Sequence, residues 1–310
     1  MKRFLSAILA VIAILGLIPV EAEQVTWNES TRIDEVTRFR GLGPDDLPGG
    51  HRLLFRQHAV QSAPDLVQQY PARQDGGDRN YMREKADAGE QIFYRIYTDA
   101  EIAADPWKAD TGLFFFKGNP GAKVAICNAG GGFAYVGAMH DSFPHALELS
   151  KMGYNAFALI YRPGSQTACE DLAHAIAFIH EHADELEVDA ADYSLWGGSA
   201  GARMAAWLGS YGTAAFGEKD YPRPSAVIMQ YTGLSEVYGN EPPTYNCVGT
   251  NDGIASYRTM ERRIAAIQAN GTDAMIEVFP GLSHGFGLGT GTVADGWIYN
   301  AVSFWERNMK

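Results

Sequence analysis

From residue 91 to the end of the chain, short apolar runs alternate with longer amphipathic segments. Each run is about four to eight residues long and is bounded by Gly, Pro or Asn, as is typical of buried strands. The longer segments have apolar residues three and four positions apart, the spacing of an amphipathic helix. We predict strands at 91–98, 112–117, 123–128, 154–161, 192–196, 226–231, 245–248 and 274–279, and helices at 142–151, 168–186, 200–209, 253–269 and 293–309.

This alternation predicts an α/β fold, because a strand followed by a long helix returns to the sheet in the parallel direction. We expect a central, mostly parallel sheet of about eight strands with helices on both faces. The first two or three predicted strands have no helix between them, so we expect that edge of the sheet to be antiparallel. We expect residues 89–310 to form this main domain, an α/β-type catalytic domain.

The N-terminal residues have the composition of a secretory signal. Lys2 and Arg3 are followed by an apolar run from Phe4 to Val20, and small side chains at Val20 and Ala22 suit a signal peptidase. We expect residues 1–22 to be removed and the protein to be secreted or periplasmic, with no stable membrane span in the mature chain. An uncleaved membrane anchor is the alternative, because about 17 apolar residues lie at the lower limit for a span.

Residues 23–88 are interrupted by many prolines and glycines, which exclude long helices and strands there. A short helix at 65–69 is the one element that we expect in the first part of this segment. We interpret residues 23–88 as an N-terminal extension that packs over the main domain or caps its site.

The chain has 25 Lys and Arg residues against 37 Asp and Glu residues, a net charge of −12. The phosphates of nucleic acids and the headgroups of anionic membranes repel such a surface. We therefore expect no nucleic-acid partner and a substrate that is neutral or apolar.

Cys127, Cys169 and Cys247 are the three cysteines, and their spacing does not match a metal site. Cys127 and Cys247 lie within apolar runs, so we expect them to be small buried core residues. A disulfide between two of the three stays open, because an exported protein meets oxidising conditions and the sequence favours no pair.

The sequence Gly197-Gly198-Ser199-Ala200-Gly201 has the pattern G-x-S-x-G between a predicted strand and a predicted helix. A tight strand–turn–helix exposes the serine hydroxyl as a nucleophile, and glycine is needed where side chains would collide with neighbouring backbone. The start of the helix also places a positive dipole near the hydroxyl. The alternative is a glycine-rich helix start at which Ser199 is only the N-cap.

A serine hydroxyl needs a base, and His284 is the best candidate. It lies in a glycine-flanked loop directly after the last predicted strand, where the carboxyl ends of parallel strands gather ligands. His174, His180 and His182 lie on the long helix, and we expect them at the surface. His140 precedes Ser199 in the chain and fits the role less well.

An imidazole base needs a carboxylate to orient it, and Asp252 follows a predicted strand at the same edge of the sheet. A helix N-cap is the competing role for Asp252. The neighbouring Asn251 carries no charge, and Asp273 precedes its strand and so faces the opposite edge. The order Ser199, Asp252, His284 along the chain differs from the two common serine-protease orders.

Three successive glycines follow the predicted strand at 123–128, in the sequence Asn128-Ala129-Gly130-Gly131-Gly132-Phe133. Such a loop lets backbone N–H groups approach a reacting carbonyl oxygen. We expect the N–H groups of Gly131, Gly132 and Ala200 to form an oxyanion hole. A phosphate-binding loop is excluded, because no Lys-Ser or Lys-Thr follows and the glycine spacing differs.

Taken together and in order, five motifs resemble the α/β-hydrolase family over roughly residues 90–310: GGGF, Tyr161-Arg162-Pro163, GGSAG, GTNDG and LSHGF. The chain is most similar to the bacterial esterase branch related to hormone-sensitive lipase and to acetyl-xylan or feruloyl esterases. That branch usually has His or Pro just before the three glycines, where this chain has Ala129. The resemblance implies an α/β-hydrolase fold and an acyl-enzyme on Ser199 that water releases, with neither a metal nor an organic cofactor.

The first hypothesis for function is therefore an exported serine esterase that acts on short acyl esters of a small molecule or a polysaccharide, with acetylated carbohydrate as one candidate. A serine peptidase of the prolyl-oligopeptidase type is the second, but such peptidases carry a large extra domain for which 310 residues leave no room. A non-catalytic binding protein on the same fold is the third, and an intact Ser199, Asp252 and His284 argue against it.

Overall fold

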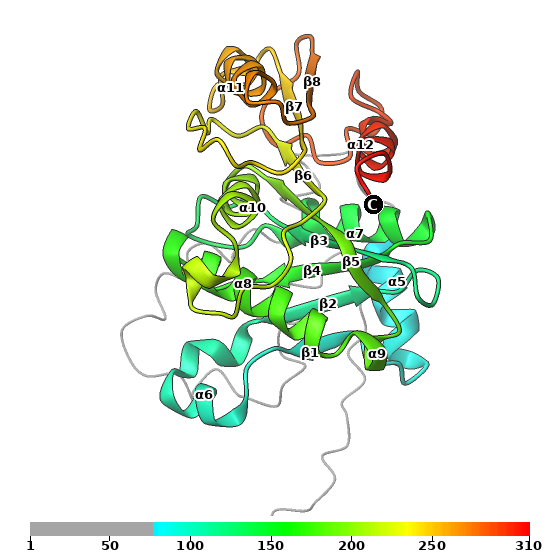
Figure 1. Cartoon of the computed structure of the whole chain (residues 1–310). Helices are drawn as coiled ribbons and strands as arrows, with labels where there is room; N and C mark the ends of the chain where they lie inside the picture. The colour runs from blue at the N-terminus through cyan, green and yellow to red at the C-terminus, as the bar shows by residue number, and fades with distance from the viewer. Residues whose placement is uncertain (1–76) are drawn as a thin grey trace, which may run out of the picture.

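The computed structural model describes residues 77–310, and a single eight-stranded sheet lies at the centre of this part of the chain (Figure 1). The predicted signal at 1–22, the predicted helix at 65–69 and most of the extension lie outside the described residues. The strands are β1 (Phe93–Arg95), β2 (Gly112–Phe116), β3 (Lys123–Asn128), β4 (Asn155–Ile160), β5 (Asp189–Gly198), β6 (Ala226–Gln230), β7 (Thr244–Gly249) and β8 (Ala274–Phe279).

The strand order is β1-β2-β4-β3-β5-β6-β7-β8. All pairs from β4 to β8 are parallel, whereas β1 with β2 and β2 with β4 are antiparallel. The prediction of a mostly parallel sheet with an antiparallel edge is confirmed. The edge is antiparallel because the short connection 117–122 reverses the chain between β2 and β3, and β3 runs parallel to β4.

One expectation at this edge is wrong, because helices do separate the first two strands. α6 (Asp99–Ala104) and the 3-10 helix η3 (Pro106–Asp110) lie between β1 and β2. Thr98 and Glu101 form a capping box in which each side chain accepts from the other residue's backbone N–H. β1 is shorter than the predicted 91–98 at both ends, and Thr98 belongs to the helix cap instead of the strand.

The longer helices cover both faces of the sheet (Figure 1). One hydrophobic cluster joins the sheet to α8 and α10, and a second joins the other face to α7 and α12. α11 packs against β7 and β8. The helices are α5 (Gly77–Asp87), α7 (Ser142–Lys151), α8 (Ser165–Glu181), α9 (Ala183–Leu186), α10 (Ala200–Tyr211), α11 (Tyr257–Ala269) and α12 (Trp297–Glu306), with 3-10 turns η4 (Ala138–His140) and η5 (Thr213–Phe216).

Four predicted helices differ from the observed ones at their ends, and the smallest difference is in α10, which ends two residues after the predicted 200–209. The predicted 168–186 begins three residues earlier, after Gly164, and is divided into α8 and α9. The predicted 253–269 begins at Tyr257, because the residues after Asp252 form a turn around its side chain. The predicted 293–309 begins at Trp297, after Gly296 in a left-handed conformation (φ 87°), and ends at Glu306.

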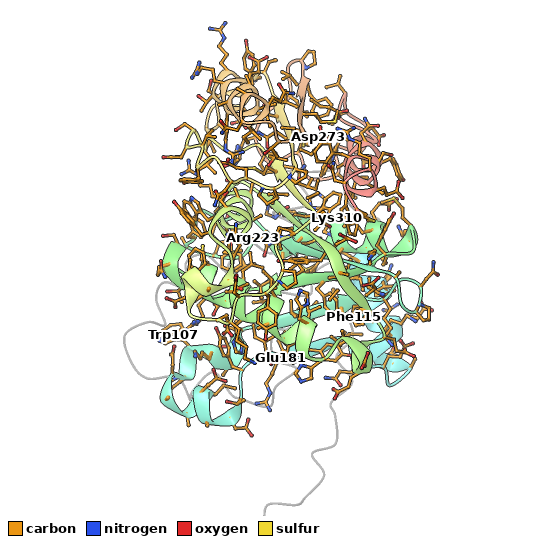
Figure 2. The ribbon with its side chains drawn as sticks, in the orientation of Figure 1. Trp107, Phe115, Glu181, Arg223, Asp273 and Lys310 are labelled. Carbon is orange, nitrogen blue, oxygen red and sulfur yellow. The ribbon has the colours of Figure 1, made fainter. Side chains whose placement is uncertain are left out.

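The core is built from large apolar side chains on both faces of the sheet. Phe115 of β2 belongs to this core, whereas Trp107 of η3 is 44% exposed; both are labelled in Figure 2. Complete burial of such side chains typically contributes about 1.5–3 kcal/mol each. The prediction that Cys127 and Cys247 are buried is confirmed, and all three cysteines are buried and free.

α5 is the described part of the N-terminal extension, and it packs against α7. Tyr81 stacks on Phe116 at 5.3 Å between ring centroids and accepts a hydrogen bond from Lys117 N–H at 3.0 Å. Because β2 runs against the parallel strands, its C-terminal end lies at their amino edge. α5 therefore lies over the main domain at the edge opposite the carboxyl ends of the parallel strands.

The strand order places two loops beside each other at the carboxyl edge. β3 lies between β4 and β5, so the chain leaves β3 toward one side and reaches β5 on the other. At such a switch point no connection covers the carboxyl ends of the strands, and a crevice forms there. The loops after β3 and β5 therefore border the same site.

Candidate active site

Ser199 lies in the sharp turn between β5 and α10, with φ 53° and ψ −112°. A Cβ on Gly197 would lie 2.3 Å from the Gly201 carbonyl carbon, and a Cβ on Gly201 would lie 2.0 Å from the Asn128 oxygen. Both positions therefore require glycine. A non-glycine residue in such a conformation typically costs about 1–3 kcal/mol, and the surrounding structure must hold it.

The hydroxyl of Ser199 does not cap the helix that follows it. Ser199 holds the N-cap position of α10, but its side chain makes no capping hydrogen bond. Its Oγ lies 3.1 Å from His284 Nε2 instead, and its backbone N–H donates to Gln230 O at 3.0 Å. The contact with His284 favours a nucleophile over the N-cap alternative.

His284 lies in the loop after β8 and connects Ser199 to Asp252. Its Nδ1 lies 2.8 Å from Asp252 Oδ2, and its side chain is 19% exposed. Because a carboxylate only accepts, Nδ1 carries the hydrogen, and in the neutral ring Nε2 is left to accept from the Ser199 hydroxyl. This tautomer is the one that a general base requires.

Asp252 is held by three donors. Oδ1 accepts from the backbone N–H groups of Ile254 at 2.8 Å and Ala255 at 2.7 Å, and Oδ2 faces His284. Burial alone would raise the pKa of Asp252, but the hydrogen bonds from His284, Ala255 and Ile254 outweigh it and hold the pKa below its usual range. Asp252 is therefore an ionised carboxylate at neutral pH.

The loops that carry Asp252 and His284 are joined by backbone hydrogen bonds. Asn251 N–H donates to Leu282 O at 3.0 Å, and Thr250 N–H donates to Phe279 O at 2.9 Å. Gly249 lies against Leu282 so closely that a Cβ there would lie 1.9 Å from its oxygen. These contacts fix the carboxylate relative to the ring.

The glycine loop after β3 faces the turn at Ser199. Gly131 and Gly132 have φ values of 133° and 61°, which favour glycine. Among the backbone hydrogen bonds of loops, turns and caps in residues 77–310, none is donated by the N–H groups of Gly131, Gly132 or Ala200. Gly130 N–H differs, because it donates to Asp141 Oδ2 at 2.7 Å.

A family model described as BD-FAE matches residues 117–254, a range that includes the glycine loop, Ser199 and Asp252. No curated protein matches the chain by sequence. An acetyl ester-xyloside bifunctional hydrolase from Caldicellulosiruptor lactoaceticus is similar in structure, with a TM-score of 0.61 and 20% identity over 69% of this chain and 95% of that one.

The chain has the α/β-hydrolase fold. Two further similar structures are of esterase 2 from Thermogutta terrifontis. Its propionate-bound form has a TM-score of 0.59 and 21% identity over 69% of this chain and 93% of that one. Its form phosphonylated by cyclosarin has a TM-score of 0.56 and 19% identity over 71% and 93% of the two chains.

In this fold, Tyr161 and Arg162 of the motif Tyr161-Arg162-Pro163 have different partners. The Tyr161 hydroxyl donates to Ala129 O at 2.7 Å, at the start of the glycine loop. The Arg162 guanidinium instead pairs with Asp171 at 2.7 Å on α8. Tyr161 therefore supports the site, whereas Arg162 joins β4 to a helix.

The prediction that the histidines of the long helix lie at the surface is wrong in part. His174 is half-buried, with Nδ1 2.6 Å from Glu218 Oε1 and Nε2 3.0 Å from Ile96 O. His180 is half-buried between Tyr193 and Tyr221. These rings are covered by residues distant in the sequence, and helical periodicity does not predict such contacts.

Sequence reasoning missed Asp141, His145 and Tyr231. Asp141 and His145 are buried at the start of α7, and the Tyr231 ring lies 4.8 Å from the His284 ring. Tyr231 has a positive φ of 34°, which is rare for a residue with a Cβ. An acidic residue four positions before a histidine was a weak signal for the first pair, and no pattern marked Tyr231.

Two further findings concern residues 77–310 as a whole. In residues 77–310, no group of three or more His, Cys, Asp or Glu side chains is placed to hold a metal ion. Across the same residues, no helix has the length and apolar character that a membrane span needs.

Proposed function

We propose that the protein is an exported serine esterase, in which Ser199 is the nucleophile, His284 the general base and Asp252 the carboxylate that orients it. The contact of His284 with both Ser199 Oγ (3.1 Å) and Asp252 Oδ2 (2.8 Å) carries this proposal. An activated nucleophile is recognised by a base within hydrogen-bond reach that a third group orients.

In the first half-reaction, Ser199 Oγ attacks the ester carbonyl carbon and its proton passes to His284 Nε2. The carbonyl oxygen becomes an oxyanion, which accepts hydrogen bonds from Gly131, Gly132 and Ala200 N–H. The carbon–alkoxide bond then breaks, and the leaving alcohol takes the proton from His284. Asp252 stabilises the imidazolium between these steps.

In the second half-reaction, water attacks the acyl-enzyme and His284 accepts a proton from it. The second tetrahedral intermediate uses the same oxyanion donors. When the bond to Ser199 Oγ breaks, His284 returns the proton to the serine. The products are a carboxylic acid, an alcohol and the free enzyme.

We assign short acyl groups as substrates, with acetylated carbohydrate as the candidate class. The propionate-bound esterase and the acetyl ester-xyloside hydrolase among the similar structures support this choice. The signal-like residues 1–22 support it as well, because a polysaccharide cannot enter a cell.

A fluorophosphonate probe tests the nucleophile. We expect it to label the folded protein at Ser199, and we expect Ser199→Ala to abolish both labelling and ester hydrolysis while the protein stays folded. Heat-denatured protein is the control for non-specific labelling. If the folded protein is not labelled at Ser199, the enzyme proposal is wrong.

A substrate panel tests the bond and the acyl group. Nitrophenyl acetate, butyrate and octanoate are compared with acetylated xylan and methyl ferulate. We expect the acetate to give the highest kcat/KM among the nitrophenyl esters and acetylated xylan to release acetate. Turnover of a prolyl-peptide nitroanilide with no turnover of esters would indicate the peptidase instead.

A further inference from the structure

Asp141 is a buried acid beside the glycine loop that the mechanism above does not use. It lies between η4 and α7 and is 2% exposed. Its Oδ2 accepts from Gly130 N–H at 2.7 Å, and its Oδ1 lies 3.3 Å from Nδ1 of His145, which is 3% exposed. A buried carboxylate that accepts from a backbone N–H makes a short and strong hydrogen bond.

The carboxylate is ionised where it lies. Burial alone would raise the pKa of Asp141, but His145, the charge of His140 and the Gly130 N–H outweigh it and hold the pKa below its usual range. The interaction with Gly130 therefore has the strength of a charge-assisted bond at neutral pH.

The backbone around Gly130 is fixed on both sides of this bond. Ala129 O accepts from the Tyr161 hydroxyl at 2.7 Å, and Gly130 O accepts from Gly137 N–H at 2.9 Å. Ala129 has no polar side chain of its own to support the loop. The orientation of the peptide that leads into Gly131 therefore depends on residues outside the loop.

Asp141 also fills the corner where the glycine loop meets the turn at Ser199. A Cβ on Gly130 would lie 3.1 Å from Ser199 Cβ and 3.3 Å from Asp141 Oδ2. A Cβ on Gly198 would lie 2.4 Å from the same oxygen, so Gly198 leaves no room for a side chain and Gly130 is tightly packed. The carboxylate thus contacts both backbone segments that supply the oxyanion donors.

We propose that Asp141, buried beside His145, is a positioning residue that holds Gly130 N–H and thereby aims the N–H groups of Gly131 and Gly132 at the oxyanion. This inference rests on the proposed ester hydrolysis. Because the interaction orients donors whose bonds strengthen in the transition state, it acts on kcat and leaves substrate binding almost unchanged.

The test compares Asp141→Ala and Asp141→Asn with Asn155→Ala. Asn155 is a matched control, because it is a buried side chain that accepts from a glycine N–H, that of Gly118 at 3.0 Å, at the amino edge of the sheet. The measurements are kcat and KM on nitrophenyl acetate, the inhibition constant of a trifluoromethyl ketone, which forms an anionic adduct with a serine nucleophile, and the midpoint of thermal unfolding.

We expect Asp141→Ala to lower kcat by about 10- to 100-fold, less than the 10²- to 10³-fold of a deleted donor, and to change KM by less than about twofold. The ketone should bind more weakly by a factor similar to the loss in kcat. Asp141→Asn should recover most of the kcat, because its amide oxygen still accepts from Gly130 N–H. Asn155→Ala should lower the unfolding midpoint and leave kcat and ketone affinity unchanged.

A folded Asp141→Ala protein with kcat and ketone affinity within about threefold of the parent would overturn the inference, since oxyanion donors are worth far more than that. If this variant does not fold, Asp141→Ser answers the same question, because its hydroxyl is too close to the backbone to replace the carboxylate oxygen. If the parent hydrolyses no ester, the proposed function fails and the inference fails with it. If the parent is active and Asp141→Ala is unaffected, the inference is wrong but the proposed function stands.

Discussion

Asp252 has two roles at the scale of a single residue, since one carboxylate oxygen faces His284 and the other accepts from two backbone N–H groups. We predict that Asp252→Asn lowers kcat by about 10³- to 10⁴-fold. The side-chain amide of Asn can donate to His284 Nδ1, and this favours the tautomer in which Nε2 carries the hydrogen and cannot accept from Ser199. Stopped assays on nitrophenyl acetate measure the loss.

Asp273→Asn is the control for this change. Asp273 is bonded to Arg307 at 2.9 Å and precedes β8, at the edge of the sheet opposite the candidate site. The control variant should keep the kcat of the parent. An Asp252→Asn protein that keeps full activity would show that another residue orients His284.

The lowered pKa of Asp252 also predicts how stability changes with pH. Because the folded pKa lies below the ordinary value of 3.8, this group stabilises the fold above that value, and the contribution is lost as the pH falls through the folded pKa. We expect the difference in the free energy of unfolding between the parent and Asp252→Asn to shrink as the pH falls from about 6 to about 3. Urea titrations across this range measure it, and a difference that grows on acidification would contradict the assignment.

At this scale the sequence predicted Ser199, Asp252 and His284 as a set, because each follows a predicted strand and their order along the chain matches a known arrangement. The structure brings these three side chains together. The role of Asp141 was beyond prediction, because the spacing to His145 is only a weak signal and its partner in the loop is a backbone N–H eleven positions earlier. A contact between a side chain and a loop backbone leaves no periodic or motif signature.

At the scale of secondary-structure elements, α6 shows how a local signal decides where a helix begins. Thr98 Oγ1 accepts from Glu101 N–H at 3.3 Å, and Glu101 Oε2 accepts from Thr98 N–H at 2.9 Å. We predict that Thr98→Ala lowers the free energy of unfolding by about 1 kcal/mol, because the first turn of α6 loses its cap. Urea denaturation measures the change.

Ser256→Ala is the matched control for the cap. Ser256 holds the N-cap position of α11, but its side chain makes no capping hydrogen bond. Its replacement should therefore cost much less than that of Thr98. Equal losses for the two variants would show that the capping box does not stabilise α6.

The T-x-x-E pattern at 98–101 made α6 predictable, but the alternating residues of 91–98 favoured a longer strand. The start of α11 was not predictable in the same way. Asp252 draws the N–H groups of Ile254 and Ala255 to its side chain, so the helix begins after them. Helix propensity does not include such a turn, in which an aspartate side chain accepts from the N–H groups two and three positions later.

At the scale of the whole molecule, the alternation of strands and helices was enough to predict a parallel sheet covered on both faces. It did not predict that β3 lies between β4 and β5. Strand order depends on pairings between distant segments, which local patterns do not encode. The order matters for function, since it brings the glycine loop beside Ser199.

We predict that the mature protein begins at Glu23, which leaves 23 basic and 36 acidic residues and a net charge of −13. When the full chain is expressed in a bacterial host, intact mass spectrometry of the periplasm and medium should find this species. A variant that lacks residues 2–22 is the control and should stay in the cytoplasm. A full-length mass in the membrane fraction would favour the uncleaved anchor.

Chemical labelling of the buried cysteines would report when the folded molecule opens. Burial raises the pKa of the Cys127 and Cys247 thiols far above the usual value, so the folded protein holds them unreactive. Cys127 lies in β3 and Cys247 in β7, on opposite sides of the strand that leads to Ser199. A maleimide added to the native protein therefore reacts with each thiol only when that half of the sheet opens, without any engineered label.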